Sequence, residues 1–132
     1  MEVNGIGGVF IYANDPRSLA EWYSRHLGIE FTRDEASDNH YMLFYYRDDY
    51  EPSKRLDTTF AILPARGSLG LDRGEFMINF RVNDLEVLAT QLAAAGIAVE
   101  EIQILRDGEG FGKFTHLVDL EGNQIELYQP LR

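Results

Sequence analysis

The sequence predicts an α+β protein made of two βαβββ modules in a pseudo-twofold repeat. Three observations predict this fold. A strand-like segment followed by a helix-like segment occurs twice, about 69 residues apart, so that Asp15 aligns with Asp84 and Asn14 with Asn83. Three further strand-like segments follow each helix. The length of 132 residues suits one domain, with module 1 at about 1–66 and module 2 at about 73–132.

The first module begins with a strand that has two unlike faces. Residues 6–13 alternate, with Val9, Ile11 and Ala13 on one side and Gly8, Phe10 and Tyr12 on the other. Asp15 is a candidate N-cap, Pro16 suits the first helical turn, and helical spacing continues over 16–27 up to Gly28. Strands are then predicted at about 29–33, 40–47 and 57–63.

The second module repeats this order after a linker at residues 64–74, which is rich in glycine. Ile78, Phe80 and Val82 form one face of its first strand, and Met77, Asn79 and Arg81 form the other. Asp84 is predicted to cap a helix that ends at Gly96, and strands are predicted at about 98–105, 113–119 and 123–129.

The composition excludes several classes of function. The chain has no cysteine, which excludes disulfides and thiolate sites, and no segment that resembles a secretory signal or a membrane span. A cytoplasmic location is therefore expected. The net charge of −10 speaks against nucleic-acid binding and favours neutral or cationic ligands.

Four segments carry a family resemblance: Val9–Pro16, Trp22–Gly28, Phe80–Leu85 and, most specifically, Asp119–Pro130. They resemble the vicinal oxygen chelate superfamily, which includes glyoxalase I, extradiol dioxygenases, and fosfomycin- and bleomycin-resistance proteins. The last segment resembles the pattern Asp-Pro-x-Gly-Asn-x-Ile-Glu-Leu, with Leu120 in place of the proline. The resemblance covers nearly the whole chain. It implies that the mixed sheet curls into a cup with the helices outside, and that the cup usually holds a divalent metal.

The metal ligands that the resemblance implies are mostly missing. The superfamily commonly has a histidine seven residues before the aspartate of each helix, where this chain has Gly8 and Met77. Its last-strand carboxylate matches Glu126 in module 2, but Ala61 stands at the corresponding place in module 1. A thioether suits soft metals and one carboxylate binds a divalent ion weakly. We therefore expect no catalytic metal and no cofactor.

Alternation along the strands predicts what lines the cup instead. Aromatic walls with an amide, a guanidinium and a carboxylate make a site for a small organic molecule that is aromatic or cationic. The predicted ligand-binding residues are Phe10, Tyr12, Tyr45, Phe60, Met77, Asn79, Arg81, Phe111 and Tyr128.

Glu126 is the centre of the predicted chemistry, and its partner is left open by the sequence. It either pairs with Arg81 as a structural ion pair, or it works on a ligand that Arg81 orients. If His116 faces the same side of the sheet, His116 and Glu126 form the best acid–base candidate for catalysis.

Of three other features, one is expected to have no role in the site and two have two interpretations each. His26 is expected at the surface near a helix end, and His40 lies either at the rim of the cup or at a strand edge. The segment Gly108–Gly112 is either a mobile loop over the cup or an ordinary turn, because it opens no helix as a phosphate loop would.

Three functions fit the sequence. The leading one is a metal-free small-molecule-binding protein similar to the bleomycin-resistance branch. The alternative is a metal-dependent lyase, isomerase or dioxygenase that uses Glu126 as ligand or base, with His40 and His116 as further candidates. A regulatory subunit whose cup is filled by its own side chains is the third. The resemblance also implies a homodimer, with no nucleic-acid or membrane partner.

Overall fold

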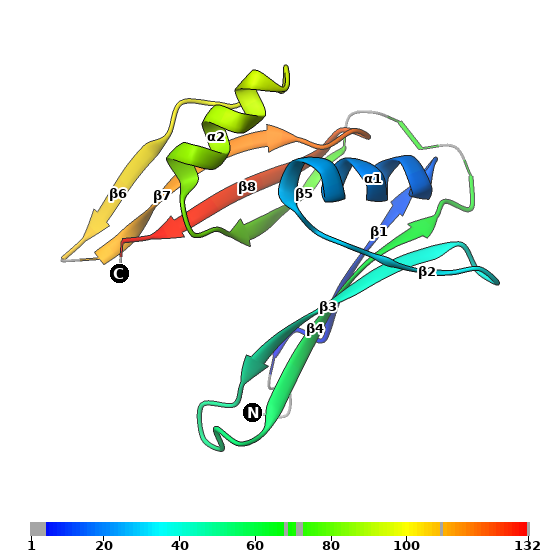
Figure 1. The fold of residues 1–132 in the computed structure, drawn as a ribbon, viewed down its shortest axis with the longest axis horizontal. Coiled ribbons are helices and arrows are strands. Elements are labelled where there is room, and N and C mark those ends of the chain that lie inside the picture. The colour runs from blue at the N-terminus through cyan, green and yellow to red at the C-terminus, as the bar shows by residue number, and fades with distance from the viewer. Residues whose placement is uncertain (1–4, 68, 71–72, 109, 132) are drawn as a thin grey trace. The chain divides into compact units, whose positions relative to one another are not determined.

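The computed structural model describes residues 5–67, 69–70, 73–108 and 110–131 of the chain (Figure 1). The chain divides into two compact units, Met1–Leu69 and Gly70–Arg132. Each contains one helix and one open four-stranded mixed sheet, which confirms the predicted α+β repeat of βαβββ modules. No helix in the described ranges is long and apolar enough to cross a membrane.

Unit 1 consists of β1 (Gly8–Ala13), α1 (Pro16–Leu27), β2 (Thr32–Asp34), β3 (Asn39–Arg47) and β4 (Arg55–Pro64). Its strands lie in the order β1-β4-β3-β2, with β1 parallel to β4 and the other pairs antiparallel. Helix α1 begins where Asp15 Oδ1 accepts a hydrogen bond from the Ser18 N–H at 3.1 Å. It ends at Gly28, whose φ of 69° is one that residues other than glycine rarely adopt.

The core of unit 1 lies between α1 and one face of the sheet. Ile11 and Ala13 on β1 and Ile62 on β4 are at most 2% exposed. Tyr23 of α1 packs edge-on against Phe60, with ring centroids 5.4 Å apart. The alternation predicted for β1 is therefore correct, because Phe10 and Tyr12 lie on the opposite face and are exposed.

Unit 2 consists of β5 (Arg73–Arg81), α2 (Leu85–Ala94), β6 (Gln103–Asp107), β7 (Gly110–Val118) and β8 (Asn123–Pro130). Its strand order, β5-β8-β7-β6, repeats that of unit 1, with β5 parallel to β8. Figure 1 shows α2 lying along one side of this sheet. The Leu85 N–H at the start of α2 donates to Gln129 Oε1 on β8 at 2.8 Å, and Lys113 on β7 pairs with Glu86 on α2 at 2.8 Å.

The two faces of the unit 2 sheet differ in chemistry. The face toward α2 is apolar and includes the buried Leu117, Ile125 and Leu127. We call the face turned away from α2 the distal face. Because side chains alternate along a strand, it carries the following residues of β5, β7 and β8: Met77, Asn79, Arg81, Phe114, His116, Val118, Gln124, Glu126 and Tyr128.

Two predicted strands begin later than the sequence pattern indicates. The strand expected at 29–33 is β2, which starts at Thr32, because the Ile29 N–H donates to the Tyr23 carbonyl and continues the helix end. The strand expected at 98–105 is β6, which starts at Gln103. Residues before it border β7 through single bonds, with the Glu100 N–H donating to the His116 carbonyl at 3.1 Å.

Candidate ligand-binding site

The turn before β8 fixes the strand that carries Glu126. Asp119, which is 5% exposed, accepts hydrogen bonds from the N–H groups of Glu121 and Asn123, both at 2.9 Å, and from Asn123 Nδ2 at 2.8 Å. Gly122 supplies the positive φ of 86° that the turn needs. Leu120, where the superfamily pattern has proline, is exposed. The segment Asp119–Pro130, the most specific part of the family resemblance, thus contains the turn that starts β8.

A polar cluster lies on the distal face around Glu126, and we define it as Asn79, Glu100, His116 and Glu126. Asn79 Nδ2 donates to Glu126 Oε1 at 2.7 Å. His116 Nε2 lies 2.7 Å from Glu126 Oε2, and His116 Nδ1 lies 3.1 Å from Glu100 Oε2. The side chain of Glu126 is 19% exposed, that of His116 36% and that of Glu100 71%. The cluster therefore leads from the sheet to solvent.

The cluster shows which side chains Glu126 contacts, a point that the sequence leaves open. His116 faces the same side as Glu126 and is paired with it in register across β7 and β8. Glu126 bonds Asn79 and His116, and in the described part of the chain it does not pair with Arg81. Arg81 shares the distal face, but its partner across β5 and β8 is Tyr128, which lies two residues after Glu126.

Glu100 is a member of the cluster that sequence reasoning missed. It lies in the irregular segment before β6, where a continuous strand is predicted. The Thr115 hydroxyl donates to the Glu100 carbonyl at 2.6 Å, which holds this segment against β7. No local pattern predicts such a contact, because it joins residues 16 apart and Glu100 itself lies in a segment without regular secondary structure.

An aromatic shelf adjoins the polar cluster on the distal face, formed by Phe111, Phe114 and Tyr128. The rings of Phe114 and Tyr128 stack with centroids 5.1 Å apart and planes 19° apart. Phe111 lies edge-on to Phe114 at 5.3 Å. Its φ of 122° is rare for a residue with a side chain, and it breaks the alternation at the start of β7. Of the segment Gly108–Gly112, Glu109 lies outside the described residues; Gly108 has a φ of 62°, and β7 begins at Gly110.

Glycine at position 112 makes room for the shelf. A Cβ placed on Gly112 would collide with the Tyr128 ring and would lie 3.0 Å from the Gln129 carbonyl oxygen. Tyr128 can therefore lie flat against the backbone of β7 only because residue 112 has no side chain. Phe114 and Tyr128 are direct neighbours of His116 and Glu126 along their strands, at the next position on the same face.

An open pocket of about 360 Å³ lies at the other end of the polar cluster. Glu100 and His116 form its polar wall, with Gln124 beside them, and Met77 and Val118 contribute apolar surface. Predicted site residues Met77, Asn79, Arg81, Phe111 and Tyr128 thus all belong to unit 2, on or beside its distal face.

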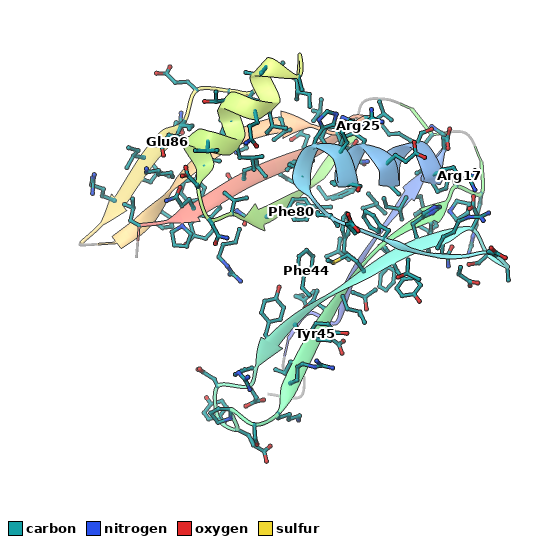
Figure 2. All side chains as sticks on the ribbon, viewed as in Figure 1. Arg17, Arg25, Phe44, Tyr45, Phe80 and Glu86 are labelled. Atoms are coloured by element: carbon teal, nitrogen blue, oxygen red, sulfur yellow. The ribbon has the colours of Figure 1, made fainter. Side chains whose placement is uncertain are left out.

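The predicted site residues of unit 1 fall into two groups. Phe10, Tyr12 and Tyr45 lie on the face of the sheet opposite α1 and are exposed. The guanidinium carbon of Arg55 lies 4.1 Å from the ring centroid of Tyr45, which Figure 2 labels on β3. Phe60 lies instead in the core, 2% exposed between Tyr23 and Phe31. Phe60 is therefore removed from the candidate ligand face.

The other two histidines, His26 and His40, belong to unit 1. His40, expected at a rim or strand edge, lies instead on β3 between β2 and β4, is 6% exposed, and has Nδ1 3.2 Å from the Asp38 carbonyl oxygen. Its environment is the α1 side of unit 1, where it borders a groove with Arg17 and Glu21. The His26 ring lies near the end of α1, with its centroid 5.2 Å from that of Trp22 and the ring planes tilted by 59°.

The donor set does not fit the metal that the fold implies. The Phe10 ring lies against Gly8, so that a Cβ there would come within 2.8 Å of it, and a histidine side chain has no room. Ala61 has no donor atom in its side chain, so Glu126 is the one position that carries a ligand the superfamily pattern implies. Among the described residues, no group of three or more His, Asp or Glu side chains is placed to hold a metal ion.

Comparison with known proteins agrees with this architecture. The sequence pattern of the family described as a glyoxalase-like domain matches residues 8–128. No curated protein matches the sequence. Among solved structures, TnmS3, an antibiotic-binding protein from Streptomyces sp. CB03234, is 19% identical with a TM-score of 0.67, covering 98% of each chain.

Two further structures have the same fold. A glyoxylase/bleomycin resistance protein/dioxygenase domain from Frankia sp. EAN1pec is 20% identical with a TM-score of 0.62, over 96% of this chain and 92% of the other. The fosfomycin resistance protein FosX from Listeria monocytogenes is 15% identical with a TM-score of 0.66, over 96% and 93%. With its two modules, its closing turn and this match over nearly its whole length, the chain belongs to the glyoxalase-like domain family of the vicinal oxygen chelate superfamily.

Proposed function

We propose that the protein binds a small planar organic molecule on the distal face of unit 2 without a metal. The observation that carries this proposal is the aromatic shelf beside the polar cluster. Phe114 and Tyr128 offer a flat apolar surface, and Asn79, His116 and Glu126 supply directional polar groups one residue pair away. Apolar surface with a few convergent polar groups is what small-molecule sites generally present.

The structural neighbours support a binding function. TnmS3 is described as an antibiotic-binding protein and FosX as a fosfomycin resistance protein. Their low sequence identity carries over only the fold, so the argument for this chain rests on its own distal face. The exposed aromatic residues of unit 1, Phe10, Tyr12 and Tyr45, are proposed as further ligand-binding residues.

The test uses 2-naphthylmethanol, a neutral planar probe, and follows backbone amide signals by NMR. We expect saturable shifts at β7 and β8. In Tyr128→Leu, which keeps apolar bulk but removes the stacking surface, affinity should fall about tenfold, equivalent to ~1.4 kcal/mol. Tyr50→Ala, which removes a 98% exposed tyrosine, is the matched control and should bind as the wild type does. No saturable shift at β7 and β8, or equal affinity for Tyr128→Leu, would contradict the proposal.

The metal-free state is tested separately. Because Gly8, Ala61 and Met77 offer no suitable ligand, elemental analysis of protein purified without chelators should find no stoichiometric Zn, Ni, Fe or Mn. Thermal unfolding should likewise be unchanged by these ions, since an ion that binds the native state would stabilise it. A stoichiometric metal would overturn this part of the proposal.

One observation favours an enzyme as the second candidate. The 2.7 Å contact between His116 Nε2 and Glu126 Oε2 is within the range that proton transfer requires. A lyase or isomerase that uses this pair as acid and base would lose activity in both Glu126→Gln and His116→Gln, whereas a binding protein turns over no substrate. A screen for turnover of small carbonyl compounds separates the two functions.

A further inference from the structure

We propose that the polar cluster makes the site selective for a planar ligand that carries a protonated amine, with Glu100 as a specificity-determining residue. The inference rests on the proposed function, because it concerns the same face of unit 2. It names the chemical class of the ligand and a residue that neither the sequence pattern nor the family match assigns.

The formal charge of the polar cluster depends on how its two carboxylates and its imidazole share protons. An ionised carboxylate only accepts hydrogen bonds, and a neutral imidazole has one N–H and one lone pair. Both ring nitrogens of His116 lie within 3.1 Å of a carboxylate oxygen, Nδ1 at Glu100 and Nε2 at Glu126. A neutral ring between two ionised carboxylates would oppose two lone pairs at one of these contacts.

Two lone pairs do not meet when the imidazole is protonated, or when the exposed Glu100 carboxylate turns toward solvent. With both carboxylates ionised, the formal charge of the cluster is −1 in the first case and −2 in the second. The charge that a ligand meets is negative in both cases.

The two carboxylates of the cluster can accept more hydrogen bonds than the cluster itself supplies. Each oxygen of Glu126 accepts one bond, from Asn79 or from His116, and a carboxylate can accept about four. Glu100 is 71% exposed and uses one oxygen. Both ring nitrogens of His116 already contact a carboxylate oxygen. The unused capacity therefore belongs to the two carboxylates, which accept hydrogen bonds. A ligand group that completes the cluster must donate hydrogen bonds and, to balance the charge, must be a cation.

A cationic ligand group at the polar cluster would lie close to the aromatic shelf. Tyr128 follows Glu126 by two residues on β8, a separation of about 7 Å along the strand. On the other side of His116 lies the pocket of about 360 Å³, in whose wall Glu100 takes part. A ring on the shelf can thus extend a short arm with an ammonium group to the cluster.

Arg81 is the group that opposes this preference. It lies on the same face, two residues from Asn79 along β5 and opposite Tyr128, and would favour an anion at the far end of the shelf. Within the described ranges it makes no ion pair with the cluster. The cluster and Arg81 therefore predict opposite rankings of charged probes, and a matched series decides between them.

The experiment measures the affinities of three probes that share one ring system: 2-naphthylmethylamine, 2-naphthylmethanol and 2-naphthoate. We expect the amine to bind about tenfold more tightly than the alcohol, and the acid most weakly. In Glu100→Gln the affinity for the amine should fall about fivefold while that for the alcohol is unchanged. Glu101→Gln, which removes an exposed charge one residue away, is the matched control and should leave both affinities unchanged.

The outcomes distinguish this inference from the proposed function. If all three probes bind on β7 and β8 with equal affinity, or if 2-naphthoate binds most tightly, the inference falls and the proposed function stands. If none binds there, both fall. An equal effect of Glu100→Gln and Glu101→Gln would show general charge attraction and overturn the role of Glu100. Thermal unfolding of each variant checks that its fold is intact.

Discussion

Two glycines show how single residues determine the surface available to a ligand. Gly8 lies under the Phe10 ring in unit 1, and Gly112 lies under the Tyr128 ring in unit 2. In both units an aromatic side chain covers the backbone at a position without a Cβ. In unit 1 this glycine stands where the superfamily resemblance implies a metal-binding histidine, and a side chain there would require the Phe10 ring to move.

Gly112→Ala is expected to destabilise the protein by about 1–3 kcal/mol, because its Cβ would force the Tyr128 ring out of its stack with Phe114. Urea unfolding followed by circular dichroism measures this change. Gly67→Ala is the matched control, since a Cβ there meets nothing within 4 Å. A cost for Gly112→Ala no larger than that for Gly67→Ala would contradict the close packing of the shelf.

At the scale of the secondary-structure elements, the same device begins both helices. Asp15 caps α1 and Asp84 caps α2, each by accepting a hydrogen bond from the backbone N–H three residues later. The pKa of Asp15 lies below its ordinary value of 3.8, mainly because the Ser18 hydroxyl donates a hydrogen bond to it at 2.8 Å and the Ser18 N–H donates a second. The folded protein therefore favours the ionised form of the Asp15 carboxyl group.

Asp15→Ala should cost about 1 kcal/mol of unfolding free energy at neutral pH, which urea unfolding measures. Since the folded pKa is depressed, the contribution of the ionised group is complete above 3.8 and is lost as the pH falls through the lower folded value. Asp15→Asn keeps an acceptor for the cap but cannot titrate, so its stability should depend less on pH in that acidic window than the wild type's. Equal pH dependence of the two proteins would contradict this assignment.

The turn before β8 is the second element with a specific prediction. Asp119→Ala would leave two N–H groups and the Asn123 amide without their acceptor inside the protein, which should cost about 2–3 kcal/mol. Since this turn sets the start of β8, the NMR signals of Glu126 and His116 should also shift. Asp49→Ala, at an exposed position in unit 1, should change neither the stability nor these signals.

At the scale of the whole molecule, charge and association are the properties to test. The net charge of −10 adds to the attraction that the polar cluster exerts on a cationic probe. Higher ionic strength should therefore weaken the binding of 2-naphthylmethylamine more than that of 2-naphthylmethanol, because salt screens exposed charges beyond about 10 Å at 0.1 M. Equal salt dependence would mean that charge has no part in recognition.

The homodimer implied by the superfamily resemblance stays a prediction. Symmetric dimers are the commonest soluble oligomers, and each unit carries exposed apolar residues, such as Phe10 in unit 1 and Val87 in unit 2. Light scattering at micromolar concentration should give about twice the mass of the 15.1 kDa chain. A monomer at that concentration would contradict the prediction.

The sequence by itself determined the two modules, both helix caps, the glycine stop of α1 and the faces of β1. These are local properties. A cap needs a side chain within three residues of the N–H groups that it satisfies, and an alternating strand shows its buried face when only one face is apolar. Ile11 and Phe10 could therefore be assigned to opposite sides without a structure, whereas the assignment of Asn79 and Glu126 to one side depended on the family resemblance.

Only the tertiary structure decided where Phe60, His40, Phe111 and Glu100 lie. The segment around Phe60 has apolar residues at successive positions, so its pattern could not choose a face until Tyr23 and Phe31 packed against one of them. The ring of Phe111 is aimed by a positive φ that no sequence pattern predicts. Glu100 reaches His116 from a segment without regular structure, because contacts between distant residues depend on how the chain folds back and not on the spacing along it.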